Sequence, residues 1–138
     1  MKVRSFDPEK DYPLVKSWWE AQKLAPIPKH ALPGIGYVAY NEDMDVAVGW
    51  MDMSLFGIMC YFYGFLANDA APPTRIIEAH DTIMDIMEFY AKGEGYSVIV
   101  NTPHQLSLKK LAIKKGYLEN HPSVSQLFKI LRLKEDPA

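Results

Sequence analysis

Apolar and polar residues alternate along the chain with two different periods, and these periods predict its helices and strands. The most regular segment is residues 74–95, where apolar side chains recur at helical spacing and stop at Gly93 or Gly95. The longest apolar run, residues 58–67, is rich in aromatic residues and has the length of a central strand covered on both faces. Gly64 within this run predicts a bulge or a close approach of other atoms. The other predicted elements, in chain order, are a strand at 2–6, a helix at 12–22, a loop at 25–36, two strands within 37–54, a strand at 96–103, a helix at 106–116 and a strand at 125–133.

The order of these elements indicates the fold class. Residues 37–54 contain two strand-like runs around the acidic turn at 41–45, which is typical of an antiparallel hairpin. The last third of the chain alternates strand, helix and strand, so we expect a mixed sheet with helices on its faces, in the α+β class. A Rossmann fold is disfavoured, because a glycine-rich turn would follow its first strand and residues 7–13 read "DPEKDYP" instead.

Composition limits the class of protein. A chain of 138 residues with 49% apolar content suffices for one domain with a real core, and no stretch is long or apolar enough for a membrane span. We therefore expect a single domain over 1–138 and no membrane partner. Cys60 is the only cysteine and residues 1–20 lack the pattern of a secretory signal, which favours the cytoplasm. The four histidines and the cysteine lack the paired spacing of a zinc site, so no metal is expected.

The net charge of −2 is unevenly distributed. Residues 7–52 carry eight acidic and four basic side chains, residues 69–94 carry six and two, and residues 104–134 carry one acidic and seven basic side chains. A basic run on a helix is more often a solvated face than a binding surface. A protein that reads duplex DNA would need a stronger basic field or a docking motif, so nucleic acid is not an expected partner.

Three segments carry a resemblance to a known family. They are residues 3–20 ("VRSFDPEKDYPLVKSWWE"), residues 45–50 ("DVAVGW") and residues 100–117 ("VNTPHQLSLKKLAIKKGY"). The chain resembles the GNAT superfamily of acetyl-CoA-dependent N-acyltransferases, and its small bacteriophage-encoded members most closely. The resemblance covers the whole chain in the order of its elements. The positions that match the family's closing motif are Asn101, Ser107, Leu108, Leu111, Gly116 and Tyr117.

The resemblance implies a GNAT-like sheet, mixed and mostly antiparallel, with splayed central strands and helices on both faces. It also implies that acetyl-CoA is the co-substrate and that the acceptor is a primary amine of a small molecule or of a host protein. The pantetheine arm would pair with the backbone of the fourth strand, and the pyrophosphate would meet the amides that begin the next helix. The implied cofactor-binding residues are Phe65, Leu66, Ala67, Thr74, Arg75, Ile76, Asn101 and Ser107, and the implied substrate-binding residues are Trp19, His30 and Tyr63.

Two departures from the family pattern bear on activity. The loop that would hold the pyrophosphate, "NDAAPPTRIIEAH", contains no glycine, and each of its two prolines removes an amide donor. The guanidinium of Arg75 is a candidate replacement. Many members of the family place a tyrosine as general acid at a position that Ala112 occupies here, so no catalytic residue is assigned. Tyr61, Tyr63 and Tyr117 are the tyrosines that could substitute for it.

Two interpretations of the function therefore remain. The first is acetyl transfer from acetyl-CoA to an amine. The second is a GNAT-fold protein without catalysis that binds a protein partner through exposed Trp18 or Trp19, or through the basic C-terminal helix. Acidic side chains in the turn at 41–45 could attract an amine, but a solvated hairpin turn is the favoured interpretation of them. The last predicted strand, residues 125–133, is a candidate sheet edge for a homodimer.

Overall fold

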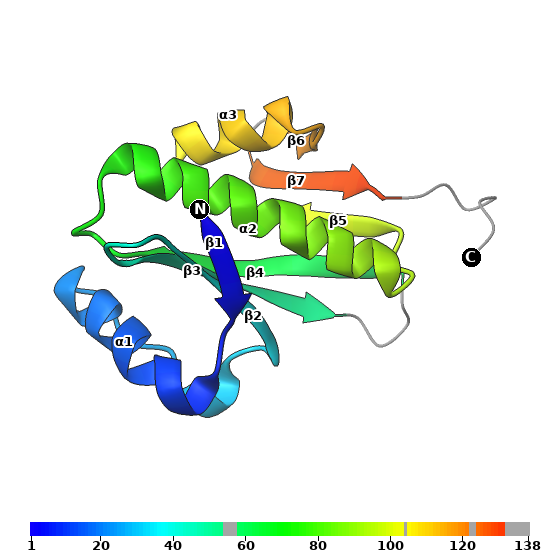
Figure 1. Ribbon diagram of the computed structural model, residues 1–138. Coiled ribbons are helices and arrows are strands. Elements are labelled where there is room, and N and C mark those ends of the chain that lie inside the picture. The colour runs from blue at the N-terminus through cyan, green and yellow to red at the C-terminus, as the bar shows by residue number, and fades with distance from the viewer. Residues whose placement is uncertain (54–57, 104, 122–123, 132–138) are drawn as a thin grey trace.

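The computed structural model of the chain describes residues 1–53, 58–103, 105–121 and 124–131. No helix of the described ranges is long and apolar enough to cross a membrane. Figure 1 labels the α-helices and strands in these ranges. In chain order they are β1 (Lys2–Ser5), α1 (Pro8–Ala21), the 3₁₀ turn η1 (Lys29–Ala31), β2 (Ile35–Tyr40), β3 (Asp45–Met53), β4 (Met59–Ala67), α2 (Pro73–Gly93), β5 (Val98–Asn101), α3 (Leu106–Lys114), β6 (Leu118–His121) and β7 (Val124–Ile130).

The strands form one sheet in the order β1-β2-β3-β4-β5-β7-β6. Within the described ranges, β4 and β5 are the one pair that runs parallel, and every other neighbouring pair is antiparallel. The predicted α+β class with a mostly antiparallel sheet is therefore confirmed. Strands β4 and β5 are parallel because the long helix α2 carries the chain back to the same end of the sheet before β5 begins.

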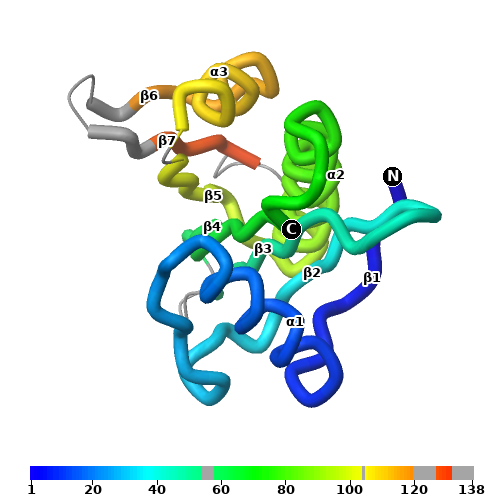
Figure 2. Tube along the Cα trace, turned by 90° about the vertical axis from the view of Figure 1, so that its left-hand side faces the viewer, coloured from blue at the N-terminus to red at the C-terminus, as the bar shows by residue number. Residues whose placement is uncertain are grey.

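Helices cover both faces of the sheet, as Figures 1 and 2 show, with α2 and α3 on one face and α1 on the other. On the α2 face, Ile83 and Met87 are fully buried against the sheet. On the α1 face, Trp19 stacks on Trp50 of β3 with ring centroids 5.7 Å apart. Trp18 and Trp19 are only 5% and 7% exposed, so the expectation that they form an exposed contact surface is wrong. Their place in the α1-side core is the reason.

The start of α1 is set by two aspartates. The side chain of Asp7 caps the helix by accepting a hydrogen bond from the amide of Glu9 at 3.0 Å. The carboxylate of Asp11 accepts hydrogen bonds from Arg4 at 2.8 Å and from the amide of Asp7 at 2.7 Å. Burial alone would raise the pKa of Asp11, but these two donors outweigh it and lower the pKa. With this cap and a proline at the first helical position, α1 begins at Pro8, earlier than the predicted residue 12.

Strand β6 was not predicted from the sequence. It pairs with β7, so that β7 lies between β5 and β6 in the sheet. The expectation that residues 125–133 form a sheet edge is therefore wrong, and the edge strands of the described sheet are β1 and β6. The sequence of β6, "LENH", does not alternate between apolar and polar residues, which is why the pattern did not reveal it.

The basic C-terminal segment is partly neutralised by the acidic helix α2. The ammonium group of Lys115, just after α3, pairs with both Asp81 and Asp85 of α2. Lys129 of β7 pairs with Glu88 of α2 at 2.9 Å. The uneven distribution of charge along the sequence thus serves in part to join α2 to the elements that follow it, and not only to solvate a helix face.

Helix α2 lies very close to the centre of the sheet. Gly49 on β3 permits this, because a Cβ atom built there would stand 2.8 Å from the Cγ2 atom of Ile83. The side chain of Ile83 has no exposed surface and belongs to the core cluster shared by α2, β3 and β4. The packing of Ile83 against Gly49 therefore fixes the position of α2 on the sheet.

Replacing Ile83 by alanine should therefore lower the free energy of unfolding by about 2–5 kcal/mol, from lost apolar transfer and the cavity left behind. Urea denaturation of the wild type and the variant measures the difference. Phe89→Ala on the same helix is the matched control, because its side chain is 82% exposed and its removal should cost less than about 0.5 kcal/mol. A loss below about 1 kcal/mol for Ile83→Ala would contradict the packing described here.

Candidate functional site

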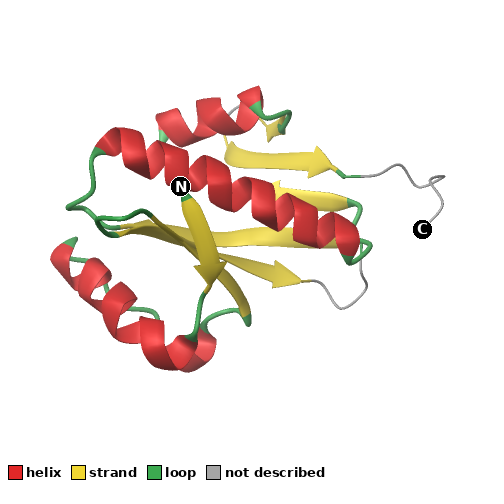
Figure 3. Cartoon of the chain, in the orientation of Figure 1, coloured by secondary structure: helices red, strands yellow, loops and turns green. Residues whose placement is uncertain are grey.

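The two central parallel strands pair for only part of their length. Their ladder runs from Met59 opposite Val98 to Phe62 opposite Asn101, where β5 ends. Strand β4 continues to Ala67, paired on its other side with β3. The divergence of the two strands predicted from the sequence is thus confirmed, although it begins at Phe62 rather than at Phe65. From Tyr63 onward, the β5-facing edge of β4 has no strand partner among the residues that the structure describes (Figure 3).

A bulge in β4 lies at the point of divergence. Met51 is opposite Phe62 and Trp50 is opposite Gly64, so Tyr63 has no opposite residue on β3. Bulges of this kind bend a strand and redirect its side chains. The bulge predicted from Gly64 is therefore present, one residue earlier, at Tyr63. The bulge changes the direction of β4 at the point where the free edge of the strand begins.

A cavity of about 590 Å³ lies along this free edge. Its walls come from the second half of β4, the first turns of α2 and α3, the residues after β5 and the end of α1. The cavity therefore brings together most of the predicted site. The predicted residues that line it are Trp19, Tyr63, Phe65, Leu66, Ala67, Ile76, Asn101 and Ser107.

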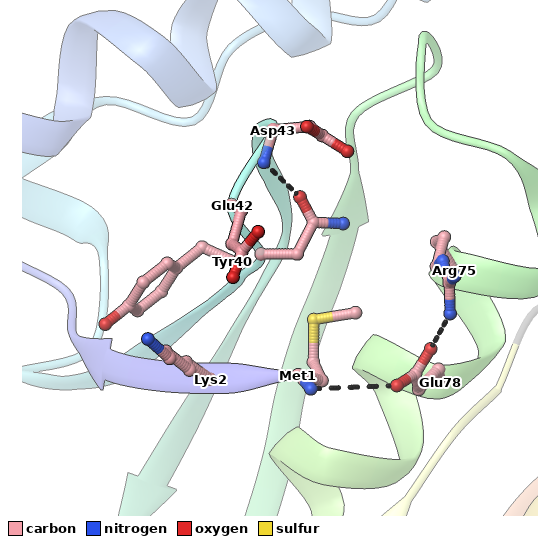
Figure 4. Close-up of a pocket in the computed structure, with 8 residues that line it drawn as sticks. Met1, Lys2, Tyr40, Glu42, Asp43, Arg75 and Glu78 are labelled. Carbon is pink, nitrogen blue, oxygen red and sulfur yellow. Dashed lines mark hydrogen bonds and ion pairs between the residues drawn. The ribbon is translucent and has the colours of Figure 1, made fainter.

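Three predicted site residues, His30, Thr74 and Arg75, do not line the cavity. His30 lies exposed in η1. The guanidinium of Arg75 donates to the carboxylate of Glu78 at 2.8 Å. As Figure 4 shows, both groups belong to a separate pocket of about 330 Å³, formed by the start of β1, the turn after β2 and the first turn of α2.

The backbone at the start of α2 offers few free amides. Pro72 and Pro73 have none, and the amides of Arg75 and Ile76 both donate to the carbonyl of Pro72, at 2.9 and 3.1 Å. Of the three amides expected to face a pyrophosphate, only that of Thr74 donates to no backbone carbonyl in the described ranges. No lysine or arginine lines the cavity within these ranges either. This end of the cavity is a weak anion site.

One buried histidine in the cavity wall was not predicted as a site residue. His80 of α2 is 1% exposed, and its ring lies against Phe62 and Phe65, with centroids 5.5 and 4.5 Å away. Its Nδ1 atom has no hydrogen-bond partner in the described ranges. Burial lowers the pKa of His80 to about 4, so the imidazole is neutral near pH 7. The signal in the sequence was a polar residue within the apolar stripe of residues 74–95.

Two further polar side chains complete the wall. Asn101, at the end of β5, is 2% exposed, and the Nδ2 atom of its amide reaches only the sulfur of Met84, at 4.0 Å. Gln22, just after α1, donates to the carbonyl of Ala67 at 2.7 Å. A ligand along β4 would thus meet the weakly bonded amide of Asn101, whereas the carbonyl of Ala67 already accepts a hydrogen bond from Gln22.

The candidate tyrosines occupy different places. Tyr63 lines the cavity and is 46% exposed. Tyr61 lies outside it, on the same strand. Tyr117 is 2% exposed, its hydroxyl has no partner in the described ranges, and burial raises its pKa far above the ordinary value. Ala112 carries no hydroxyl and has no exposed surface, so this position offers no general acid to the cavity. Tyr63 is therefore the tyrosine with access to a bound ligand.

Comparison with known proteins places this architecture among solved folds. No model of a known protein family matches the sequence, and no curated protein matches it. An N-acetyltransferase from Staphylococcus aureus Mu50 superposes with a TM-score of 0.73 at 10% identity, over 95% of this chain and 98% of that one. The aminoglycoside 6′-N-acetyltransferase from Enterococcus faecium superposes with a TM-score of 0.67 at 11% identity, over 99% and 100%. A Salmonella typhimurium protein solved with its cofactor acetyl-CoA gives 0.70 at 9% identity, over 99% and 97%. The chain therefore has the fold of these proteins, the GNAT fold.

The neutral state of His80 gives a measurable dependence of stability on pH. Because its pKa is about 4 in the folded protein and ordinarily about 6.5, the unfolded chain binds the extra proton first, and stability falls as the pH drops through this window. Between about pH 7 and about pH 4.5 the wild type should lose about 2 kcal/mol more than His80→Leu, which cannot titrate. Urea denaturation at both pH values measures the two losses. Equal losses would contradict a buried, neutral His80.

Proposed function

We propose that the protein is an acetyl-CoA-dependent N-acetyltransferase that acts on a primary amine. The observation that carries this proposal is the free edge of β4 along the cavity, from Tyr63 to Ala67, with which no strand of the described chain pairs on that side. An extended ligand that carries amide groups can pair with such an edge as an added strand. The pantetheine arm of coenzyme A is a ligand of this kind.

The residues of the cavity suit the pantetheine arm better than the pyrophosphate. Phe65 and Leu66 place apolar side chains beside the edge. The side-chain amide of Asn101 makes only a long hydrogen bond to Met84 in the described ranges, so it could also hydrogen-bond a ligand. In the described ranges, the start of α2 has one amide without a backbone partner, that of Thr74, which does not line the cavity, and no lysine or arginine lines it, so the diphosphate would be held weakly. When bound, the cofactor would supply an acetyl group activated as a thioester. The chain would bind and orient this donor, exclude water from it, and present the hydroxyl of Tyr63 near the end of the β4–β5 ladder.

A second candidate is a GNAT-fold protein without catalysis that binds a protein partner. The features that favour it are the paired guanidinium of Arg75 and the occupied amides at the start of α2. Both candidates share the fold, so they are separated by the binding of the donor and by transfer to an amine.

Acetyl-CoA at a hundred times its dissociation constant should stabilise the fold by about 2.7 kcal/mol, which raises the melting temperature of a domain of this size by roughly 10 °C. Ser107→Trp should abolish most of this rise, because the residue lies exposed on the first turn of α3 and a bulky side chain there would narrow the cavity. Differential scanning fluorimetry measures both effects.

The control for this experiment is Lys110→Trp, an exposed position of α3 that does not line the cavity, and it should keep the full rise. Arg75→Ala should reduce the rise less than Ser107→Trp, because its guanidinium is held by Glu78 in the separate pocket. Two results together would favour the non-catalytic candidate over the enzyme. They are an unchanged melting temperature in millimolar acetyl-CoA and no detectable acetyl transfer to a panel of amines.

The weak anion site predicts which half of the donor provides affinity. Acetyl-pantetheine, which lacks the nucleotide, should bind within about a hundredfold of acetyl-CoA, because about 1.5–3 kcal/mol is what one amide hydrogen bond to a charged phosphate contributes. Isothermal titration calorimetry with the two compounds gives the ratio. A much larger loss on removing the nucleotide would show that the start of α2 holds the diphosphate firmly after all.

A further inference from the structure

A second hollow lies beside the point where β4 and β5 separate. It measures about 340 Å³, and its lining includes Asp52 of β3, Tyr61 and Tyr63 of β4, and Thr102 just after β5. Of these residues, the sequence pointed to Tyr63 as a substrate-binding residue and to Tyr61 and Tyr63 as candidate replacements for the general acid, but not to Asp52 or Thr102. Figure 1 shows that α1 lies under the other end of β3, so no helix of the described chain packs over this part of the sheet.

The register of the sheet explains why these side chains meet. Asp52 is directly opposite Tyr61 in the β3–β4 ladder, and Tyr61 is opposite Val100 in the β4–β5 ladder. Side chains of opposite residues stand on the same face of a sheet. Asp52 follows Trp50 by two residues, and Trp50 belongs to the α1-side core, so the row faces away from α2. A carboxylate, a phenol ring and an apolar floor thus lie side by side.

The carboxylate of Asp52 has no partner of its own. No hydrogen bond or ion pair involves its side chain in the described ranges, and the residue is exposed. Tyr61 and Tyr63 flank the hollow with rings that are 42% and 46% exposed. An unpaired carboxylate beside accessible aromatic faces attracts an organic cation through charge and through cation–π contact. A primary ammonium group on a short alkyl chain has both features.

The hollow continues into the cavity. Phe62, Tyr63 and Thr102 line both spaces, and Phe62 belongs to the last pair of the β4–β5 ladder. Asp52 lies one strand across and two residues back from Tyr63, which corresponds to roughly 8 Å. A group held by Asp52 is therefore one short alkyl chain away from the start of the free edge, where the proposed donor would place its thioester.

We propose that this hollow binds an ammonium group through Asp52, and that the acceptor is accordingly a diamine. The inference rests on the proposed function for the place of the donor. The nitrogen that reacts must be neutral, because an ammonium has no electron pair with which to attack the thioester carbonyl. The carbon–nitrogen bond forms as the carbon–sulfur bond breaks, and the proton lost by nitrogen balances the thiolate as a thiol. The amine on Asp52 is charged and cannot react, so a second amine is required.

Binding of cadaverine, a diamine on a five-carbon chain, tests the hollow without any catalytic step. The ring signals of Tyr61 and Tyr63 in NMR spectra of the whole chain should shift on titration with cadaverine. Asp52→Asn should weaken this binding by about tenfold, as expected for the loss of one charge-assisted contact. Asp43→Asn is the matched control: it removes the same charge from the exposed turn after β2, in the separate pocket, and should leave the dissociation constant unchanged.

Two binding results would overturn the inference. One is no shift of the tyrosine signals at millimolar cadaverine. The other is an equal loss of cadaverine affinity in Asp52→Asn and Asp43→Asn, because the net charge of the protein would then explain the effect without a specific site. Asp52 is exposed, so its variant should melt at the wild-type temperature, and that measurement excludes misfolding as the cause.

Turnover with acetyl-CoA tests the acceptor class and separates it from the proposed function. Cadaverine should be acetylated, whereas n-pentylamine should bind through its only ammonium and inhibit without reacting. Equal turnover of the two amines would overturn the diamine inference and leave acetyl transfer standing. Cadaverine binding that depends on Asp52, with no transfer and no thermal shift by acetyl-CoA, would instead refute the proposed function and leave the ammonium site standing.

Discussion

The early end of the β4–β5 ladder is the constraint on which the site depends. The ladder stops at Phe62 and Asn101 because Pro103 has no amide to donate and the chain turns there toward α3. Strand β4 continues because β3 pairs with its other edge through Ala67. Of the backbone groups left between them, the carbonyl of Ala67 accepts a hydrogen bond from Gln22, and the groups without a protein partner can be satisfied by solvent or by a ligand. A local feature of β5 and a tertiary pairing of β4 thus create one binding edge.

The polar side chains at this edge are costly for the fold alone. His80 and Asn101 are almost completely buried. The Nδ1 atom of His80 has no partner in the described ranges, and the amide of Asn101 donates only a long hydrogen bond to the sulfur of Met84 there. A buried group without a hydrogen bond costs about 1–3 kcal/mol. An aliphatic residue at position 80 would pack against Phe62 and Phe65 without this cost. Residues that oppose local stability in this way concentrate at functional sites, where a ligand supplies the missing partner. The position of both residues on the cavity wall agrees with that explanation.

The sequence predicted the parts of the fold that depend on periodicity, and it predicted less of what depends on tertiary contacts. Helix α2 and strand β4 have long, regular patterns, and their bounds agree with prediction within one or two residues. Strand β6 has only four residues without alternation, so its pairing with β7 was not foreseen. The direction of the Arg75 side chain depends on Glu78, one turn further along the helix, and no property of the loop sequence indicates which pocket it enters.

Site residues divide along the same line. The resemblance to the GNAT family implied the backbone positions on β4, and they could be carried over because a strand edge does not depend on side-chain identity. His80 was missed because the pattern of an apolar helix face absorbs a single histidine, and only its burial without a partner sets it apart. Asp52, which lines the second hollow, was not singled out because an isolated acid at the end of a strand has no sequence signature. Its neighbours Tyr61 and Val100 become visible only through the register of three strands.

The cavity along β4 and the hollow beside it differ in charge. The cavity along β4 has no lysine or arginine in the described ranges, whereas the adjoining hollow has an unpaired carboxylate. A donor held by backbone pairing does not rely on long-range attraction, so its affinity should change little with ionic strength. An acceptor held by Asp52 relies on a single exposed charge pair, which salt screens. Added salt would then weaken the binding of the acceptor and leave that of the donor nearly unchanged, because the acceptor is bound by charge and the donor by hydrogen bonds to the main chain.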